Sequence, residues 1–156
     1  MSEKNIYRII KNISIFKNLE SRHIELLYKQ FYRKKIKKNT LLFSENDAGQ
    51  EMFIILSGAI EIFHEYNKKH KTLALLKDGD FFGEISVLTS LPRTASVKAI
   101  TDSEILILNQ NSLLELLKTN YIFSLNIIKS LSEKLINANN EINTLTFKNV
   151  QGRIAA

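Results

Sequence analysis

Between residue 32 and about residue 108 the chain consists of short runs of β-type residues separated by turn residues. The runs are TLLFSE, MFIILSG, AIEIFHEY, KTLALL, TASVKAI and EILIL. They are rich in the β-branched and aromatic side chains that fit strands. The segments between them, NDAG, SG, NKKHK, KDGD and TDS, are typical of turns. Several short strands at close, regular spacing predict a small antiparallel sandwich or barrel of jelly-roll type.

Helical patterns flank this β zone on both sides. Before it, apolar residues at helical spacing predict a helix over residues 20–31. After it, NSLLELLK predicts a short helix capped by Asn111 or Ser112. A much longer helical run begins at about residue 121 and contains no proline or glycine before Gly152. The predicted fold class is therefore α+β, an antiparallel β-roll with an N-terminal helix and a long C-terminal helix.

Composition excludes several classes of protein. With 156 residues, 44% hydrophobic and 24% charged, the chain is ordinary for one globular domain with a substantial core. It has no cysteine, so disulfides, iron–sulfur clusters and thiol redox chemistry are excluded. We expect a cytoplasmic protein without a membrane partner, because no apolar run is long enough for a bilayer and no signal peptide is visible. The net charge of +6 is interpreted as compositional bias in a chain of scattered lysines, with a nucleic-acid surface as the alternative.

The segment FFGEISVLTSLPRTASV, residues 81–97, places opposite charges in apolar surroundings. Gly83 precedes one short helical turn, EISVL, where backbone N–H groups can approach an anion. Glu84 and Arg93 flank that turn, so the chain can bring both to one pocket. An arginine suits a phosphate, and a carboxylate can accept a hydrogen bond from a sugar hydroxyl. The alternative is a buried Glu84–Arg93 pair that only fixes the loop, although such pairs stabilise poorly.

This segment resembles the phosphate-binding cassette of cyclic nucleotide-binding domains. The matching positions are Phe82 to Leu88, the spacer TSLP, and Arg93 to Val97. MFIILSGAIEIF and KDGDFFGE are also similar to segments of that family. One departure is Asn46, which stands where the family commonly has glycine; asparagine tolerates left-handed backbone, so the turn is expected to persist. The resemblance runs from about residue 13 to the end and implies a β-roll that holds a cyclic mononucleotide.

The resemblance also implies a set of ligand contacts. Glu84 would bind the ribose 2′-hydroxyl, and Arg93 with Thr94 would bind the cyclic phosphate. In the family the long helix reaches the purine. Here Ala138 offers only packing, and Asn139 is predicted to set the purine preference unless it is merely a solvated flank. The complete predicted set is Gly83, Glu84, Ile85, Arg93, Thr94, the apolar walls Ile62, Leu73 and Leu76 (which core packing would explain equally well), Ala138 and Asn139.

Apolar residues of the long run recur in steps of three and four, which is typical of a parallel two-stranded coiled coil. These residues are Ile128, Leu131, Leu135, Ala138, Ile142 and Leu145. They predict a homodimer, because Phe123 and Ile127 supply a separate apolar face for the β-roll. The alternative is a single helix packed on its own roll. The ending, LTFKNVQGRIAA, resembles the hinge of the Crp–Fnr class of bacterial transcription regulators, in which a winged helix-turn-helix domain begins with GRIA.

The predicted organisation is a cyclic nucleotide-binding β-roll with flanking helices (1–118), a dimerisation helix (119–150), and a hinge with the start of an absent DNA-binding domain (151–156). The predicted function is the effector-sensing module of a Crp–Fnr type regulator, with cyclic AMP as allosteric ligand and DNA as a partner only in a full-length form. The alternative is a sensor of the same family for another small molecule, or for no nucleotide. We expect no enzyme, metal site or other cofactor, because His23, His64 and His70 show no ligand spacing, although the last two flank a hairpin tip.

Overall fold

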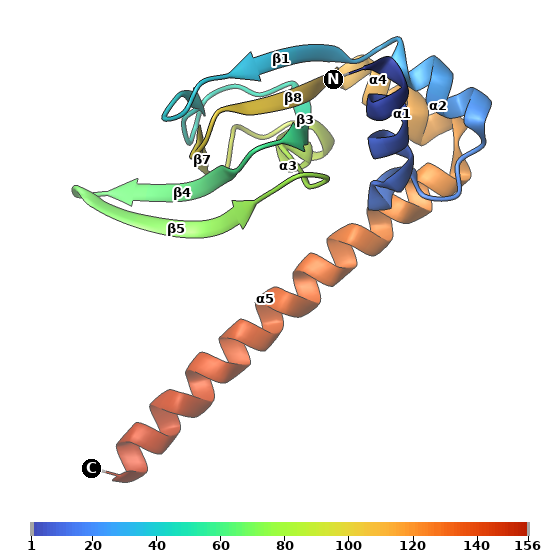
Figure 1. Ribbon diagram of the computed structural model, residues 1–156. Coiled ribbons are helices and arrows are strands. Elements are labelled where there is room, and N and C mark those ends of the chain that lie inside the picture. The colour runs from blue at the N-terminus through green and yellow to red at the C-terminus, as the bar shows by residue number, and fades with distance from the viewer. Residues whose placement is uncertain (1, 156) are drawn as a thin grey trace.

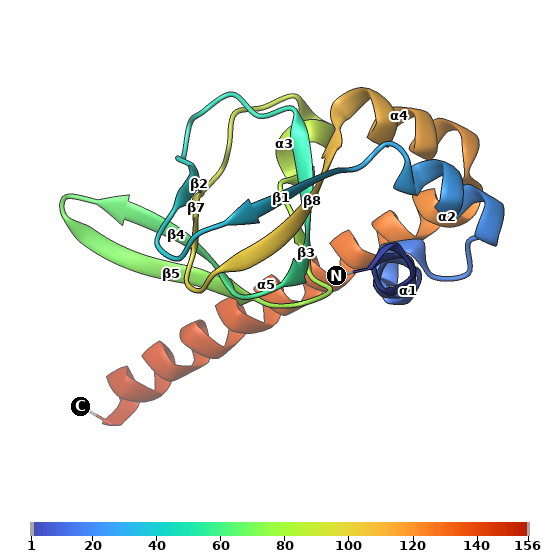
Figure 2. The same ribbon diagram turned by 45° about the horizontal axis from the view of Figure 1, so that its top comes forward.

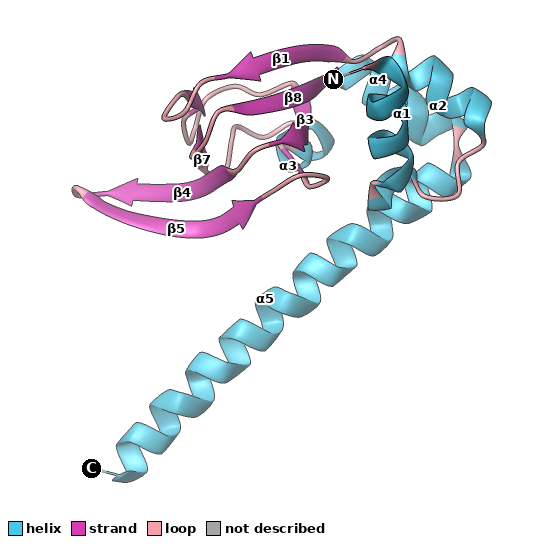
Figure 3. Ribbon diagram, viewed as in Figure 1, coloured by secondary structure: helices cyan, strands magenta, loops and turns pink. Residues whose placement is uncertain are grey.

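The computed structural model describes residues 2–155, with backbone only for residues 153–155. The strands and the short helix α3 gather at one end, α1, α2 and α4 lie at the other, and the long helix α5 runs away from both (Figures 1 and 3). Every strand pairing is antiparallel. One four-stranded sheet has the order β1 (Tyr32–Ile36), β8 (Ser103–Asn109), β3 (Glu51–Ser57), β6 (Phe81–Phe82). The other has the order β2 (Leu41–Phe43), β7 (Ser96–Ala99), β4 (Ile60–Tyr66), β5 (Lys69–Leu76).

Strand β3 separates two hydrophobic cores. Successive side chains of a strand point to opposite faces of its sheet, so both faces of β3 can be buried. Met52 and Ile54 belong to the core shared with the helices, whereas Phe53 and Ile55 belong to the core between the sheets. This explains why the run MFIILSG is apolar without a break. The β-roll is thereby fixed to the helical end through its own central strand.

The helices cover the outer face of the first sheet (Figure 2). Their bounds are α1 Glu3–Asn12, the 3₁₀ turn Ser14–Phe16, α2 Ser21–Tyr28, α3 Glu84–Thr89, α4 Gln110–Thr119 and α5 Tyr121–Ala155. Phe16 stacks on Phe123 of α5 with ring centroids 5.6 Å apart, and both side chains are fully buried. Phe123 and Ile127 thus anchor the first turns of α5 in the core that the helices share with the first sheet, whereas the sequence predicted that they pack on the β-roll itself.

The six β-type runs of the sequence are confirmed as strands β2, β3, β4, β5, β7 and β8. Two strands and one helix were missed. Strand β1 has only Ile36 buried, so no apolar alternation marks it, and β6 has two residues. Helix α1 buries only Ile6 and Ile10. The cap expected at Asn111 or Ser112 lies at Asn109, whose side-chain oxygen accepts from the Ser112 N–H at 2.9 Å.

Helix α5 is 35 residues long and continues without a break past the predicted boundary at residue 150. Residues 151–155 extend the same helix, and residue 156 of the predicted hinge lies outside the described residues. Beyond its anchored first turns, α5 presents an exposed surface over most of its length. Among the described residues, no helix combines the length and the apolar character that crossing a membrane requires.

Candidate functional site

A cavity of about 720 Å³ lies between the β-roll and α5, a size that suits a small organic ligand. Its walls come from β4, β5 and β7, from the segment 79–86 around α3, and from the middle of α5. Nine of the ten residues predicted from the sequence line this cavity: Gly83, Glu84, Ile85, Arg93, Thr94, Ile62, Leu73, Leu76 and Ala138. Asn139 is the exception. Segments far apart in the sequence therefore meet at one site.

Glu84 is a buried carboxylate at the start of α3, with 2% of its surface exposed. Gly83 precedes it with φ of 83°, a left-handed conformation that glycine adopts without strain. The partner of the carboxylate comes from α5, because the Lys134 Nζ donates to Glu84 Oε1 at 2.6 Å. The same Nζ lies 4.7 Å from the centroid of the Phe81 ring. One lysine therefore connects the long helix to the wall of the cavity.

Arg93 is a buried cation, 5% exposed. Its Nη1 donates to the Gly83 carbonyl at 3.1 Å and to the Ser86 hydroxyl at 2.8 Å, and its Cζ lies 4.2 Å from the centroid of the Phe43 ring. The Nε is buried and has no hydrogen-bond partner among the described residues. Burial lowers the pKa of Arg93, and the charges of Glu51 and Asp47 oppose that shift. An arginine nevertheless stays protonated in proteins, so a full positive charge borders the cavity with one donor unsatisfied.

Glu84 and Arg93 do not pair with each other. The carboxylate is bound by Lys134, whereas the guanidinium is bound by a carbonyl and a hydroxyl. The alternative in which the two charges form one structural pair is therefore wrong for this structure. Each group therefore keeps its own position in the cavity wall.

The conformation of the Arg93 loop depends on the turn at residues 46–49. Asn46 has a φ of 72°, so the left-handed turn persists without glycine, as expected from the sequence. Its N–H donates to the Arg93 carbonyl at 2.8 Å, and the Arg93 N–H donates to the Asp47 carbonyl at 2.8 Å. Gly49 packs against the guanidinium so closely that an added Cβ would lie 2.0 Å from Arg93 Nε. Sequence reasoning treated Gly49 as an ordinary turn glycine and so missed this close approach.

One face of α5 lines the cavity. Its residues fall at the helical positions i, i+3, i+4, i+7, i+8 and i+11, and they are Ser130, Glu133, Lys134, Asn137, Ala138 and Glu141. Asn139 lies two positions after Asn137, about 200° further around the helix. Asn139 is therefore not among the residues that line the cavity, and Asn137 is the amide that lines it. Lys134 was also missed, although it lies one turn before Ala138 on the same face.

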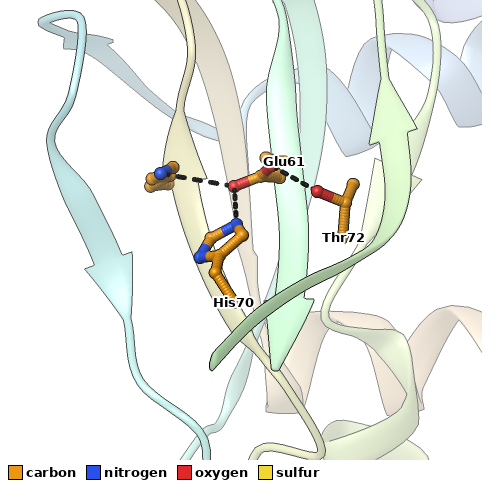
Figure 4. A network of polar contacts seen from close by, with 4 residues as sticks. Glu61, His70 and Thr72 are labelled. Carbon is orange, nitrogen blue, oxygen red and sulfur yellow. Dashed lines mark hydrogen bonds and ion pairs between the residues drawn. The ribbon is translucent and has the colours of Figure 1, made fainter. Parts of the chain in front are cut away.

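The histidines of the β4–β5 hairpin do not meet across its tip. His64 lies 3.0 Å from Glu45 through Nδ1, and His70 lies 2.9 Å from Glu61 through Nε2. Figure 4 shows Glu61 between His70 and Thr72, whose hydroxyl donates at 2.7 Å. That hydrogen bond, followed by the one from Lys98, lowers the pKa of Glu61. Among the described residues no three potential metal ligands gather in one place.

Comparisons with known proteins point to one family. The family described as Cyclic nucleotide-binding domain matches residues 33–120. The chain is 29% identical over 147 residues to the Cyclic AMP receptor protein of Thermus thermophilus, covering 94% of this chain and 68% of that one. It is 27% identical over 148 residues to the CRP-like cAMP-activated global transcriptional regulator of Mycobacterium tuberculosis, covering 94% of this chain and 66% of that one.

A solved structure shows the same architecture. The crystal structure of the Thermus thermophilus Catabolite Activator Protein superposes with a TM-score of 0.79 at 30% identity, covering 86% of this chain and 63% of that one. The predicted α+β fold, a β-roll with N-terminal helices and a long C-terminal helix, is thereby confirmed. The chain spans about two thirds of the length of these relatives.

The contact between Lys134 and Glu84 predicts a measurable coupling between α5 and α3. In a double-mutant cycle of Lys134→Met and Glu84→Gln, the free energy of unfolding measured in urea should show a coupling of about 1 kcal/mol. We expect no more, because the lysine side chain is half-exposed. Lys134→Met should therefore destabilise the chain more when Glu84 is present than when it is glutamine.

Lys129→Met is the matched control for this cycle, because Lys129 is an exposed lysine of the same helix. It should change the free energy of unfolding by no more than about 0.5 kcal/mol. If Lys134→Met and Glu84→Gln change the free energy of unfolding additively, the contact between the two side chains is contradicted.

Proposed function

Because this chain belongs to the family of cyclic nucleotide-binding domains and matches the Crp–Fnr type of regulator, we propose that its cavity binds a cyclic purine nucleotide, cyclic AMP in the first place. The chain would act as the effector-sensing part of a transcriptional regulator and would have no catalytic role. In a longer form, ligand binding would control the affinity of an attached domain for DNA. The names of the two curated relatives, a cyclic AMP receptor and a cAMP-activated regulator, support this choice of ligand.

The observation that carries the proposal is the buried guanidinium of Arg93. A buried charge is costly unless a counter-charge or hydrogen bonds compensate it. Here no carboxylate forms an ion pair with Arg93 among the described residues, and Nε lacks any partner. A singly charged cyclic phosphate would supply both the charge and the acceptors. The Thr94 hydroxyl and the backbone at Gly83 and Ile85 would complete the phosphate subsite, since these residues line the same cavity.

The remainder of the cavity suits a nucleoside. Glu84 would accept a hydrogen bond from the ribose 2′-hydroxyl, in addition to the one from Lys134 or in its place. Ile62, Leu73 and Leu76 offer an apolar wall for the flat face of a purine. Each part of the ligand would therefore have its own contact. Arg93 would bind the phosphate, Glu84 would bind the sugar, and the base would lie between the β4–β5 hairpin and α5.

Ligand binding should raise thermal stability. At a cyclic AMP concentration a hundred times the dissociation constant, the gain should be about 2.7 kcal/mol. Arg93→Leu should remove most of it, because the phosphate loses its charged partner. Arg93→Lys should retain the charge but lose part of the gain, because lysine lacks the planar set of donors.

The control is Arg8→Leu, an exposed arginine on α1 that does not line the cavity, which should leave the stabilisation unchanged. A wild-type chain that shows no shift at millimolar cyclic AMP or cyclic GMP would overturn the proposal. The alternative of a different effector would then replace it.

We further propose that α5 forms a homodimer. The predicted seam exposes large apolar side chains, among them Leu135 at 63% and Leu145 at 62%. Such side chains at a and d spacing favour a parallel coiled coil over a lone solvated helix. Leu131 is partly buried against the helical core, so it would contribute at the base of the seam. Ala138 belongs both to the seam and to the cavity lining, so the dimer axis would run beside the ligand.

The dimer can be tested by sedimentation at tens of micromolar protein. Leu135→Lys should give monomers, because it would place like charges across the two-fold axis. Asn140→Lys adds the same charge on the opposite side of the helix and should leave a dimer. A monomeric wild type under these conditions would contradict the proposed seam.

Base recognition is proposed for Asn137 in place of Asn139. An amide can pair with the amino group and ring nitrogen of adenine, and in the flipped orientation it can also pair with guanine. Asn137→Ala should weaken binding of the preferred nucleotide by about 1 kcal/mol, the net value of one hydrogen bond, and narrow the difference between cyclic AMP and cyclic GMP. Calorimetric titration of both nucleotides measures this effect.

Asn139→Ala is the matched control and should leave both affinities unchanged. If Asn139→Ala weakens binding and Asn137→Ala does not, the base is read by the opposite face of the helix. Such a result would contradict the placement of the cavity.

A further inference from the structure

The positive charge of the chain is concentrated in one short segment. Residues 29–38, KQFYRKKIKK, contain six lysines and arginines and no acidic residue. When these six are taken from the 22 lysines and arginines, 16 remain, equal to the 16 aspartates and glutamates. The segment thus carries a charge equal to the whole net charge of +6. The basic residues are therefore unevenly distributed, although the other 16 lie elsewhere in the chain.

The structure places this segment on an exposed sheet edge. Strand β1 pairs with β8 alone and ends the first sheet. All six basic residues are exposed. Figure 1 shows β1 along the side of the roll away from α5, and no residue of the segment lines the ligand cavity. The two acidic groups beside the segment are already bound, Glu104 by Arg33 and Asp102 by Lys37 together with the Lys38 N–H.

Four of the six basic side chains form no ion pair within the described chain. They are Lys29, Lys34, Lys35 and Lys38. An edge strand also has backbone N–H and C=O groups that no neighbouring strand can bind. Basic residues on such an edge keep a second copy of the same strand away by repulsion. The same charges attract an acidic strand.

We propose that β1 is a docking edge for an acidic, extended segment of a partner protein, which adds to the sheet as a further strand. Backbone hydrogen bonds would fix the register, and acidic side chains would meet the basic ones of β1. Successive strand residues point to opposite faces, so Lys34 lies on one face of the sheet and Lys35 on the other. A strand presents its own side chains to both faces in the same alternation. The phosphates of duplex DNA would reach mainly one face, so an acidic protein segment fits better than a nucleic acid.

The probe is a short fluorescent peptide of alternating threonine and glutamate, titrated by anisotropy against the 156-residue chain at physiological ionic strength. The matched probe replaces threonine by proline, which keeps the charge but cannot donate to a strand ladder. The threonine peptide should bind, and the proline peptide should bind about tenfold more weakly. In ¹⁵N correlation spectra, the backbone amides of residues 32–36 should shift most.

Two charge-reversed variants locate the site. Lys34→Glu with Lys35→Glu should weaken peptide binding about tenfold, because acidic groups would face the acidic peptide. Lys69→Glu with Lys71→Glu makes the same change of net charge on β5, the edge strand of the other sheet, and should leave binding nearly unchanged because salt screens distant charges. If both variants lose the same amount of peptide affinity, binding depends only on the net charge of the chain, and the proposal is overturned. Tighter binding of duplex DNA than of the peptide, abolished by the β1 variant, would assign the edge to nucleic acid and also overturn it.

Discussion

The buried guanidinium of Arg93 is the constraint on which the ligand cavity depends. If this positive charge is to remain available to an anionic ligand, the protein groups that hold the guanidinium must be neutral. The chain achieves this with neutral partners, a carbonyl and a hydroxyl for Nη1, the face of Phe43 for the guanidinium plane, and the bare backbone of Gly49 beside Nε. Arg93 lies between the turn at Asn46 and the start of α3 and forms hydrogen bonds to both. The result is a cation positioned in advance for an anion.

The long helix is part of the same arrangement. Lys134 binds the Glu84 carboxylate from α5, so the group proposed for the sugar hydroxyl already has a partner on the helix proposed for dimerisation. A nucleotide that uses Glu84 must share or displace this lysine. Ligand binding would then change the contact between α5 and the β-roll, which is the kind of differential interaction that a conformational response requires.

The sequence predicted the features with a local signal and missed those that depend on tertiary contacts. The six apolar runs gave six strands, because burial on one or both faces of a sheet leaves a periodic pattern. Strand β1 shows no such periodic pattern, since four of its five residues are exposed. The cassette residues Glu84 and Arg93 could be named from their motif, but their separate partners could not. Only Asn139 was predicted, as the flank of Ala138, and Asn137 was not considered. Which residues of α5 line the cavity depends on how the helix packs at Phe123 and Ile127, and that packing is a tertiary property.

A crystal structure of the chain with cyclic AMP would test the central claim most directly. The account predicts a cyclic phosphate oxygen within hydrogen-bond distance of Arg93 Nε or its terminal nitrogens. It also predicts the ribose 2′-hydroxyl on Glu84, and the purine between Leu73 and Asn137. A nucleotide bound elsewhere, or a cavity in which Arg93 keeps only its present partners at saturating ligand, would contradict the account.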